Sequence, residues 1–228
     1  MGEIESKVFE KMSKDNFQRW VVPLVDDLIL RAGKKPRRIL DVGSGPGLLV
    51  KEIAQRFKGS EVMGIDNSQV AVRLARKNSK KQKNIRFIAA EAEKLPFKDQ
   101  SFDIIVSKDS LHHFANVKKC LKEMMRVLKK QGILYIQDLR RDLPMHMLKQ
   151  AMPPDTIIKK LQYYSARASY TKDELKNILR ELGLKQFKIT TRKADFRLIR
   201  KYQKLGVEPL KLKQSFVTRY VAIVTKDK

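Results

Sequence analysis

The sequence of 228 residues contains a single cysteine, Cys120, which excludes an internal disulfide and a metal site built from several cysteines. It lacks any run of about 18 apolar residues, so no transmembrane segment is expected. Residues Met1 to Lys14 are too charged for the apolar core of a signal peptide, so we expect a cytoplasmic protein. Acidic residues are scarce, because 25 Asp and Glu stand against 50 Lys and Arg, and the formal charge is +25. This excess favours anionic partners such as nucleic acid, phosphorylated metabolites or acidic lipid surfaces.

The positive charge is concentrated in the second half of the chain. Residues 1–114 carry 22 Lys and Arg against 15 Asp and Glu, whereas residues 115–228 carry 28 against 10. Residues 185–219 alone hold eleven Lys and Arg with two acids. Four of these cations recur at helical spacing: Arg197, Arg200, Lys201 and Lys204. Two interpretations stay open for this segment, a surface that holds RNA phosphates or anionic lipid, and an ordinary solvated helix face.

Apolar runs alternate with amphipathic stretches, a pattern that predicts strands alternating with helices. The strands are expected at residues 38–42, 61–65, 85–89, 102–106 and 133–136, with helices after Gly47, after the N-cap candidate Ser68 and over 117–128. This order predicts a Rossmann-like α/β domain with a mostly parallel sheet, right-handed crossovers and helices on both faces. Two late strands, 184–191 and 216–225, lack a convincing helix between them and predict an antiparallel closing pair.

The flanking segments suggest a division of the chain. Residues 1–34 are expected to form an N-terminal helical cap in which Pro23 marks a break, and residues 35–228 the main domain. Within that domain, the Met- and Tyr-containing residues 143–170 are a candidate lid, with ordinary core packing as the alternative. Residues 192–214 form a basic insertion, and Thr171 begins a capping-box pattern that opens a helix ending at Gly183.

The most informative motif is a glycine-rich turn at residues 43–47, placed where the first strand leads into a helix. It has the pattern G-x-G-x-G with Asp41 two residues before the first glycine, unlike the G-x-G-x-x-G pattern that seats a pyrophosphate. Asp66 ends the second strand, where a carboxylate can accept hydrogen bonds from both ribose hydroxyls, and Asn67 follows it beside the expected adenine. Asp66 alone would also suit a helix cap, but together with the turn it indicates a nucleoside site.

With these features the chain resembles the class I S-adenosylmethionine-dependent methyltransferases, specifically the small-molecule group with the methyltransferase domain 11 pattern. The resemblance covers residues 35–140 and rests on the segments ILDVGSGPG, VMGID, AAEAEKLPFKDQSFDIIVS and LHHF. It implies S-adenosylmethionine as the cofactor and S-adenosylhomocysteine as the product.

The resemblance also implies a set of cofactor-binding residues. The methionine part would be held by Asp41, Gly43, Ser44, Gly45 and Gly47, with backbone contacts from Ser107 and Lys108. The ribose would be held by Asp66, and the adenine by Glu91 with the backbone of Ala92. Glu91 replaces the more usual Asp of the family, and a lysine at position 108 is unusual enough that it is also a candidate to face the acceptor.

Methyl transfer by in-line displacement needs no covalent enzyme intermediate, so positioning and dehydration provide much of the rate. An acceptor hydroxyl or ammonium would require a base, for which Asp109, His112 and His113 are candidates, although one imidazole could simply pack under the loop. No metal site is expected, since the remaining histidine, His146, lacks ligand spacing.

Two arginines and three functional hypotheses complete the sequence-based analysis. Arg140 and Arg141 follow the fifth strand and could hold an acceptor carboxylate or phosphate, with ion pairing to Asp142 as the alternative. The leading hypothesis is methyl transfer to a small metabolite, an anionic one included. The second is an RNA methyltransferase that uses the basic C-terminal half to hold phosphates, and the third is a non-catalytic binding protein on the same scaffold.

Overall fold

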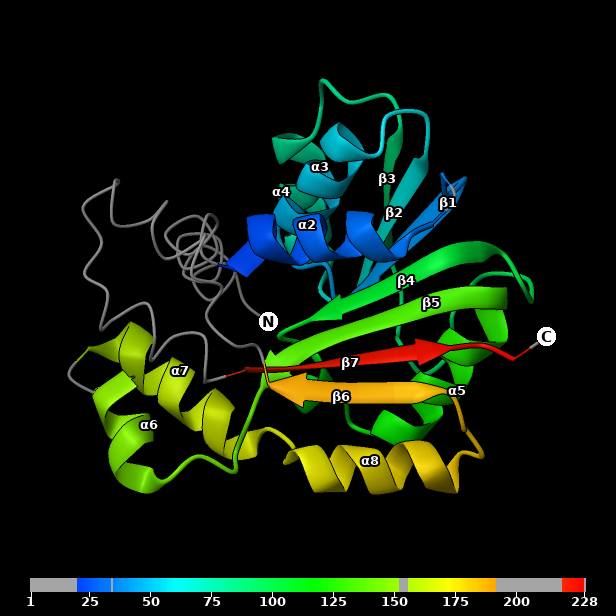
Figure 1. The fold of residues 1–228 in the computed structure, drawn as a ribbon. Helices are drawn as coiled ribbons and strands as arrows, with labels where there is room; N and C mark the ends of the chain where they lie inside the picture. The colour runs from blue at the N-terminus through cyan, green and yellow to red at the C-terminus, as the bar shows by residue number, and fades with distance from the viewer. Residues whose placement is uncertain (1–19, 34, 152–155, 192–218, 228) are drawn as a thin grey trace. The chain divides into compact units, whose positions relative to one another are not determined.

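The computed structural model describes residues 20–33, 35–151, 156–191 and 219–227 (Figure 1). In this part of the chain seven strands form one sheet with the order β3-β2-β1-β4-β5-β7-β6. The strands are β1 Arg38–Val42, β2 Glu61–Asp66, β3 Ile85–Ala89, β4 Phe102–Lys108, β5 Leu128–Leu139, β6 Phe187–Thr191 and β7 Arg219–Thr225. The sheet is mostly parallel with β7 antiparallel, which confirms the predicted Rossmann-like α/β class.

The chain forms two compact units. The first comprises Met1–Ile136 with Ile223–Lys228, and the second Gln137–Ala222. The described helices of the first unit are α2 Val22–Arg31, α3 Leu48–Arg56, α4 Gln69–Asn78, the short 3₁₀ helix η2 Leu111–His113 and α5 Val117–Val127. Those of the second are α6 Met145–Ala151, α7 Ile157–Ala168 and α8 Lys172–Glu181. No helix in the described ranges is both long and apolar enough to cross a lipid bilayer.

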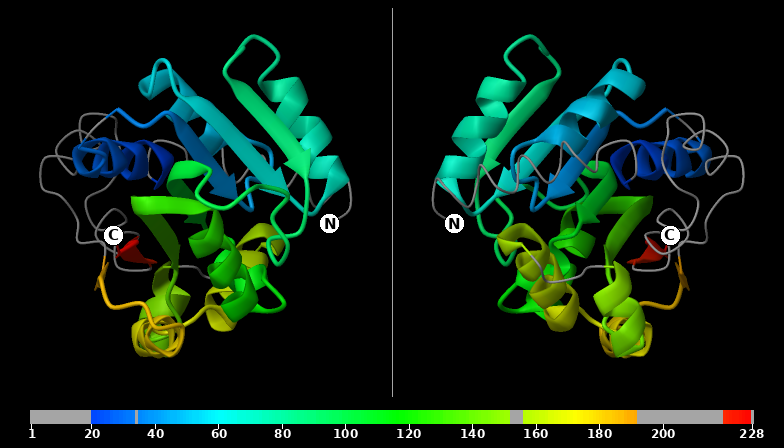
Figure 2. Two further views of the ribbon diagram at one scale, coloured as in Figure 1. Left: turned by 90° about the vertical axis from the view of Figure 1, so that its right-hand side faces the viewer. Right: turned by 90° about the vertical axis from the view of Figure 1, so that its left-hand side faces the viewer.

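The central strands of the first unit are rich in apolar residues because both of their faces are covered. Leu40 in β1, Val62 in β2 and Ile105 in β4 are completely buried, as expected for parallel strands covered on both faces. Helices α3 and α4 pack on β2 and β3, and α2 packs on α3. Figure 2 shows α4 lying alongside β3, which has several exposed residues and forms the edge of the sheet.

The register of the parallel strands brings their carboxyl ends to one edge of the sheet. Val42 pairs with Ile65 and Asp41 with Val106, while Asp66 pairs with Ala89. The loops that follow β1, β2, β3 and β4 therefore begin side by side. In open α/β sheets this edge is where ligands bind.

Some boundaries differ from the sequence-based expectation. Pro23 lies in the first turn of α2, where its missing N–H needs no partner, so it marks the start of a helix. Strand β5 begins at Leu128, which was predicted to be helical, and its early part contains a β-bulge. There the Gln131 amide donates to the Lys226 carbonyl, and the Lys226 amide donates to the carbonyl of Gly132.

In the second unit, the capping box at the start of α8 is confirmed. The Thr171 hydroxyl accepts from the Glu174 amide at 3.1 Å, and the Glu174 carboxylate accepts from the Thr171 amide at 2.8 Å. The candidate lid segment contains α6 and α7, where the buried residues Leu148 and Ala166 pack with Leu139. Strand β6 begins three residues later than predicted. The basic insertion at 192–214 lies outside the described residues.

Candidate active site

The glycine-rich turn between β1 and α3 is fixed by hydrogen bonds to the neighbouring strand. The Gly43 and Ser44 amides both donate to the Ile65 carbonyl, at 2.9 and 2.8 Å. Gly47 has φ +80°, and a Cβ there would lie 2.6 Å from the Phe87 ring, so this position requires glycine. Gly45 has φ +50°, but a Cβ there would meet no atom within 4 Å. The outer side of Gly45 is therefore open to a ligand.

The turn and the carboxylate of Asp66 are directly connected. One Asp66 oxygen accepts from the Gly45 amide at 2.8 Å, and the other accepts from the Ser68 amide at 2.9 Å. Asp66 therefore holds the turn against the end of β2 while its carboxylate remains partly exposed. Each carboxylate oxygen has a second lone pair that can accept a further hydrogen bond.

Asp41 is the most unusual ionisable residue of this edge. It is only 1% exposed, and its Oδ1 atom has no hydrogen-bond partner in the described part of the chain. Burial raises the pKa of Asp41 from 3.8 to about 7, the Lys108 ammonium opposes this rise, and the Asp66 carboxylate adds to it. The buried hydroxyl of Ser44, in the adjoining turn, is also unpartnered among the described residues. A ligand that supplies hydrogen-bond donors would satisfy both of these atoms.

The loop after β4 adds a positive charge. The Lys108 ammonium pairs with the Asp109 carboxylate at 2.5 Å, and the two side chains are only 15% and 22% exposed. Asp109 has φ +50°, an uncommon value for a residue other than glycine. The Ser110 hydroxyl lies within hydrogen-bonding distance of the Gly43 carbonyl at 3.0 Å and of the Lys108 carbonyl at 2.9 Å. Ser110 thus ties this loop to the glycine turn, a role that no sequence pattern indicated.

The remaining predicted cofactor residues lie at the same edge. Asn67 follows β2 and is exposed, and Glu91 and Ala92 follow β3, with Glu91 exposed and Ala92 partly buried. The Ser107 side chain is completely buried and donates to the Val42 carbonyl at 3.1 Å, so only its backbone is left for a ligand. The order of the strands thus gathers these residues around the glycine turn.

The two adjacent histidines both lie in η2. The rings of His112 and His113 have centroids 4.1 Å apart and are tilted by 45°, with His112 partly buried and His113 exposed. The His113 amide donates to the Ser110 carbonyl at 2.9 Å, which links the pair to the same loop. Among the residues that the structure describes, no group of three His, Cys, Asp or Glu side chains is arranged to hold a metal ion.

Arg140 and Arg141 belong to the second unit, where both have carboxylate partners. Arg140 forms a two-point ion pair with Asp142, at 2.6 and 3.0 Å, and contacts the Thr191 hydroxyl at 3.3 Å. Arg141 pairs with Glu174. Binding of an acceptor anion by either guanidinium would require it to share or exchange its carboxylate partner.

The chemistry of this edge fits a nucleoside with an amino-acid substituent. A partly exposed carboxylate at the end of β2 suits ribose hydroxyls, and the unpartnered Asp41 oxygen suits an ammonium group. The adjacent ammonium of Lys108 suits a carboxylate. The open outer side of Gly45 leaves room for close approach of the ligand to the backbone. The fold and the site together define a protein of the class I methyltransferase type.

Comparison with known proteins agrees with this class. Residues 34–183 match a family model described as a methyltransferase domain. The chain therefore belongs to the methyltransferase domain family, whose members with this fold are class I S-adenosylmethionine-dependent enzymes.

Among curated relatives, a demethylmenaquinone methyltransferase of Thermus thermophilus is 35% identical over 119 residues, which are 52% of this chain and 53% of that protein. A malonyl-[acyl-carrier protein] O-methyltransferase of Legionella pneumophila is 31% identical over 107 residues, 47% of this chain and 38% of that protein. The chain spans about half the length of the curated relatives it matches.

Solved structures share the fold over nearly the whole chain. The plantazolicin methyltransferase BpumL, in complex with a triazolic desmethylPZN analog and SAH, has a TM-score of 0.74 at 21% identity and covers 97% of this chain and 90% of its own. A SAM-dependent methyltransferase from Aquifex aeolicus has a TM-score of 0.69 at 18% identity, with 99% and 98% coverage. At this identity the likeness concerns the fold.

Proposed function

We propose that the protein transfers a methyl group from S-adenosylmethionine to a small-molecule acceptor. The observation that carries the proposal is the buried Asp41 carboxylate, whose Oδ1 has no partner among the described residues, beside a turn whose Gly45 amide is bonded to Asp66. A carboxylate in that environment is stabilised by a cationic ligand.

In this proposal different residues at the carboxyl edge of the sheet bind different parts of the cofactor. Asp41 accepts hydrogen bonds from the ammonium of the methionine part, and Lys108 pairs with its carboxylate. Asp66 accepts from the ribose hydroxyls with its remaining lone pairs. The Ser44 hydroxyl and the open side of Gly45 contact the intervening chain, and Asn67, Glu91 and Ala92 border the adenine.

When bound, the cofactor supplies a methyl carbon on a positively charged sulfur, which a nucleophilic acceptor attacks as a neutral thioether leaves. The chain contributes mainly orientation and dehydration. Most residues of β1 and β4 are buried, and the Ser110 hydroxyl holds the loop after β4 against the glycine turn. Since the Asp109 carboxylate already holds Lys108, we assign removal of an acceptor proton to His112 or His113, imidazole being the usual base at neutral pH.

A small-molecule acceptor is supported by the names of the curated relatives, a demethylmenaquinone methyltransferase and a malonyl-[acyl-carrier protein] O-methyltransferase. We retain Arg140 and Arg141 as residues that bind an anionic acceptor in exchange for their ion pairs with Asp142 and Glu174.

The test uses methyl-labelled S-adenosylmethionine, purified protein and a cell extract separated into small-molecule, lipid, protein and RNA fractions. We expect label in the small-molecule or lipid fraction, and none with the Asp41→Asn variant. Label confined to proteins other than an acyl-carrier protein would refute the proposed acceptor class, and label in no fraction with binding-competent protein would refute the activity.

A second candidate function is methylation of RNA, favoured by the charge of +25 and by the basic hollow described next. In the same experiment this function predicts that label enters the RNA fraction and is released as methylated nucleosides after nuclease digestion.

A further inference from the structure

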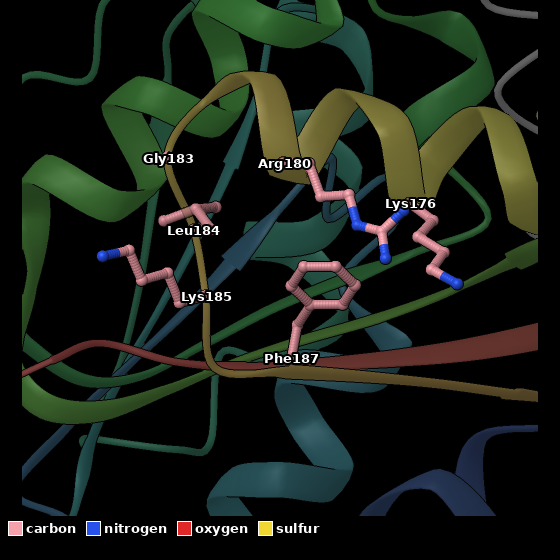
Figure 3. Close-up of a pocket in the computed structure, with 6 residues that line it drawn as sticks. All are labelled: Lys176, Arg180, Gly183, Leu184, Lys185 and Phe187. Atoms are coloured by element: carbon pink, nitrogen blue, oxygen red, sulfur yellow. The ribbon is translucent and has the colours of Figure 1, made fainter.

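The second unit contains an open hollow of about 450 Å³ between the C-terminal half of α8 and the start of β6 (Figure 3). Six residues line it: Lys176, Arg180, Gly183, Leu184, Lys185 and Phe187. Three are cations, one is aromatic and none is acidic. Its volume is in the range of sites that accept a nucleotide-sized ligand.

The hollow is a defined feature of the backbone. Helix α8 ends in a Schellman motif, in which the Gly183 amide donates to the Arg180 carbonyl at 2.9 Å and the Leu184 amide donates to the Leu179 carbonyl at 3.0 Å. Gly183 has φ +74°, and a Cβ there would meet nothing within 4 Å, so the floor of the hollow is open at this point. The turn therefore fixes the direction of the chain after α8, on which Lys185 and Phe187 lie.

The cations are disposed at two places along the hollow. Lys176 and Arg180 are one turn apart on α8, and their charged groups lie on the same side of the Phe187 ring in Figure 3, whereas Lys185 extends from the connecting loop. Within the described residues, none of the three forms an ion pair with a carboxylate. Compensation of the helix dipole accounts for a cation in the last turn, such as Arg180, but not for Lys176 in mid-helix or for the half-buried aromatic ring.

We propose that this hollow binds single-stranded nucleic acid. Lys176 and Arg180 hold one phosphate, Lys185 holds a neighbouring phosphate, and the base between them stacks on Phe187. Separate cations on either side of a ring match the alternation of phosphates and bases along a strand, which a single free phosphate does not offer. An acidic protein would need a much larger complementary surface and would not require the concavity. The site is independent of which acceptor is methylated.

The test measures the binding of a fluorescein-labelled 12-nucleotide oligouridylate by fluorescence anisotropy over a series of salt concentrations. The variant Lys176→Gln/Arg180→Gln/Lys185→Gln should bind at least tenfold more weakly at low salt. Its salt dependence should be flatter by about 1.4 in log K against log salt, because two phosphate contacts are lost and each contact to a single strand contributes about 0.7.

The matched control removes the same charge elsewhere, at exposed lysines of the first unit: Lys58→Gln/Lys80→Gln/Lys94→Gln. It should change the affinity less than threefold. Equal losses in the two triple variants would overturn the proposal, because the strand would then respond only to overall charge.

Phe187→Leu tests the stacking contact separately from charge. We expect roughly tenfold weaker binding with an unchanged salt slope, as for loss of one base stack. Circular dichroism of each variant checks the fold, and the charge variants decide the question if Phe187→Leu is unstable. Competition by uridine monophosphate as effective per nucleotide as the strand would overturn a strand site in favour of a free nucleotide. Retained binding of S-adenosylhomocysteine separates failure here from failure of the proposed function.

Discussion

Asp41 connects stability to function in a way that can be measured. The carboxylate is 1% exposed, and burial raises its pKa from 3.8 to about 7. Between those two values the folded protein retains a proton that the unfolded chain has lost, so stability falls as pH rises through this window. The full effect is roughly 4 kcal/mol, of which roughly 3 kcal/mol falls between pH 5 and pH 8.

The variant Asp41→Asn cannot ionise and lacks this dependence. We therefore expect the unfolding free energy of the ligand-free wild type, relative to the variant, to fall by roughly 3 kcal/mol between pH 5 and pH 8. Urea denaturation followed by circular dichroism measures the difference, with Asp227→Asn, an exposed carboxylate of the same unit, as control. The variant should at the same time lose affinity for S-adenosylhomocysteine. If the unfolding free energies of the wild type and the variant change with pH in parallel, the claim that burial destabilises the ionised Asp41 carboxylate is refuted.

Three further predictions concern the glycine turn at Gly45 and Gly47, the Lys108 ammonium and the Cys120 thiol. Gly45→Ala should cost only the backbone strain of its positive φ, about 1–2 kcal/mol, and should weaken S-adenosylhomocysteine binding, whereas Gly47→Ala should cost that strain plus about 1–3 kcal/mol from its clash with the Phe87 ring. The opposite order of the two stability losses would contradict the assignment of the open side to Gly45. Lys108→Met should weaken S-adenosylhomocysteine roughly tenfold and leave 5′-methylthioadenosine, which lacks the amino-acid carboxylate, unchanged by calorimetry; equal losses would mean that Lys108 only supports the loop. Burial raises the pKa of Cys120 to about 12, so Ellman's reagent should not label the native protein at pH 8 and should label it on unfolding; rapid labelling of the native thiol would disprove its burial.

The fold was predictable because its main determinants are local in sequence. Strands buried on both faces give short apolar runs, as in Ile104 to Val106, and the glycine turn and Asp66 mark where β1 and β2 end. The boundaries of β5 are harder to predict from the sequence, because its bulge depends on pairing with Lys226, almost a hundred residues away.

The sequence predicts which residues lie at the candidate active site but not the contacts between them. Sequence spacing places Asp41, Asp66 and Lys108 at the ends of adjacent strands. It does not reveal that Oδ1 of Asp41 has no hydrogen-bond partner among the described residues, that Asp66 holds the Gly45 amide, or that Ser110 ties two loops together. These features arise from contacts between segments distant in sequence, which leave no periodic pattern.

The central claim is that the turn from Asp41 to Gly47 and the carboxylate of Asp66 hold one nucleoside cofactor. A crystal structure of the protein soaked with S-adenosylhomocysteine tests it most directly. The account predicts ligand density over Gly45, with the ribose hydroxyls at hydrogen-bonding distance from Asp66, about 2.5–3.0 Å, and the ammonium beside Asp41. Density for the ligand at another place on the chain, with this edge empty at saturating concentration, would contradict it.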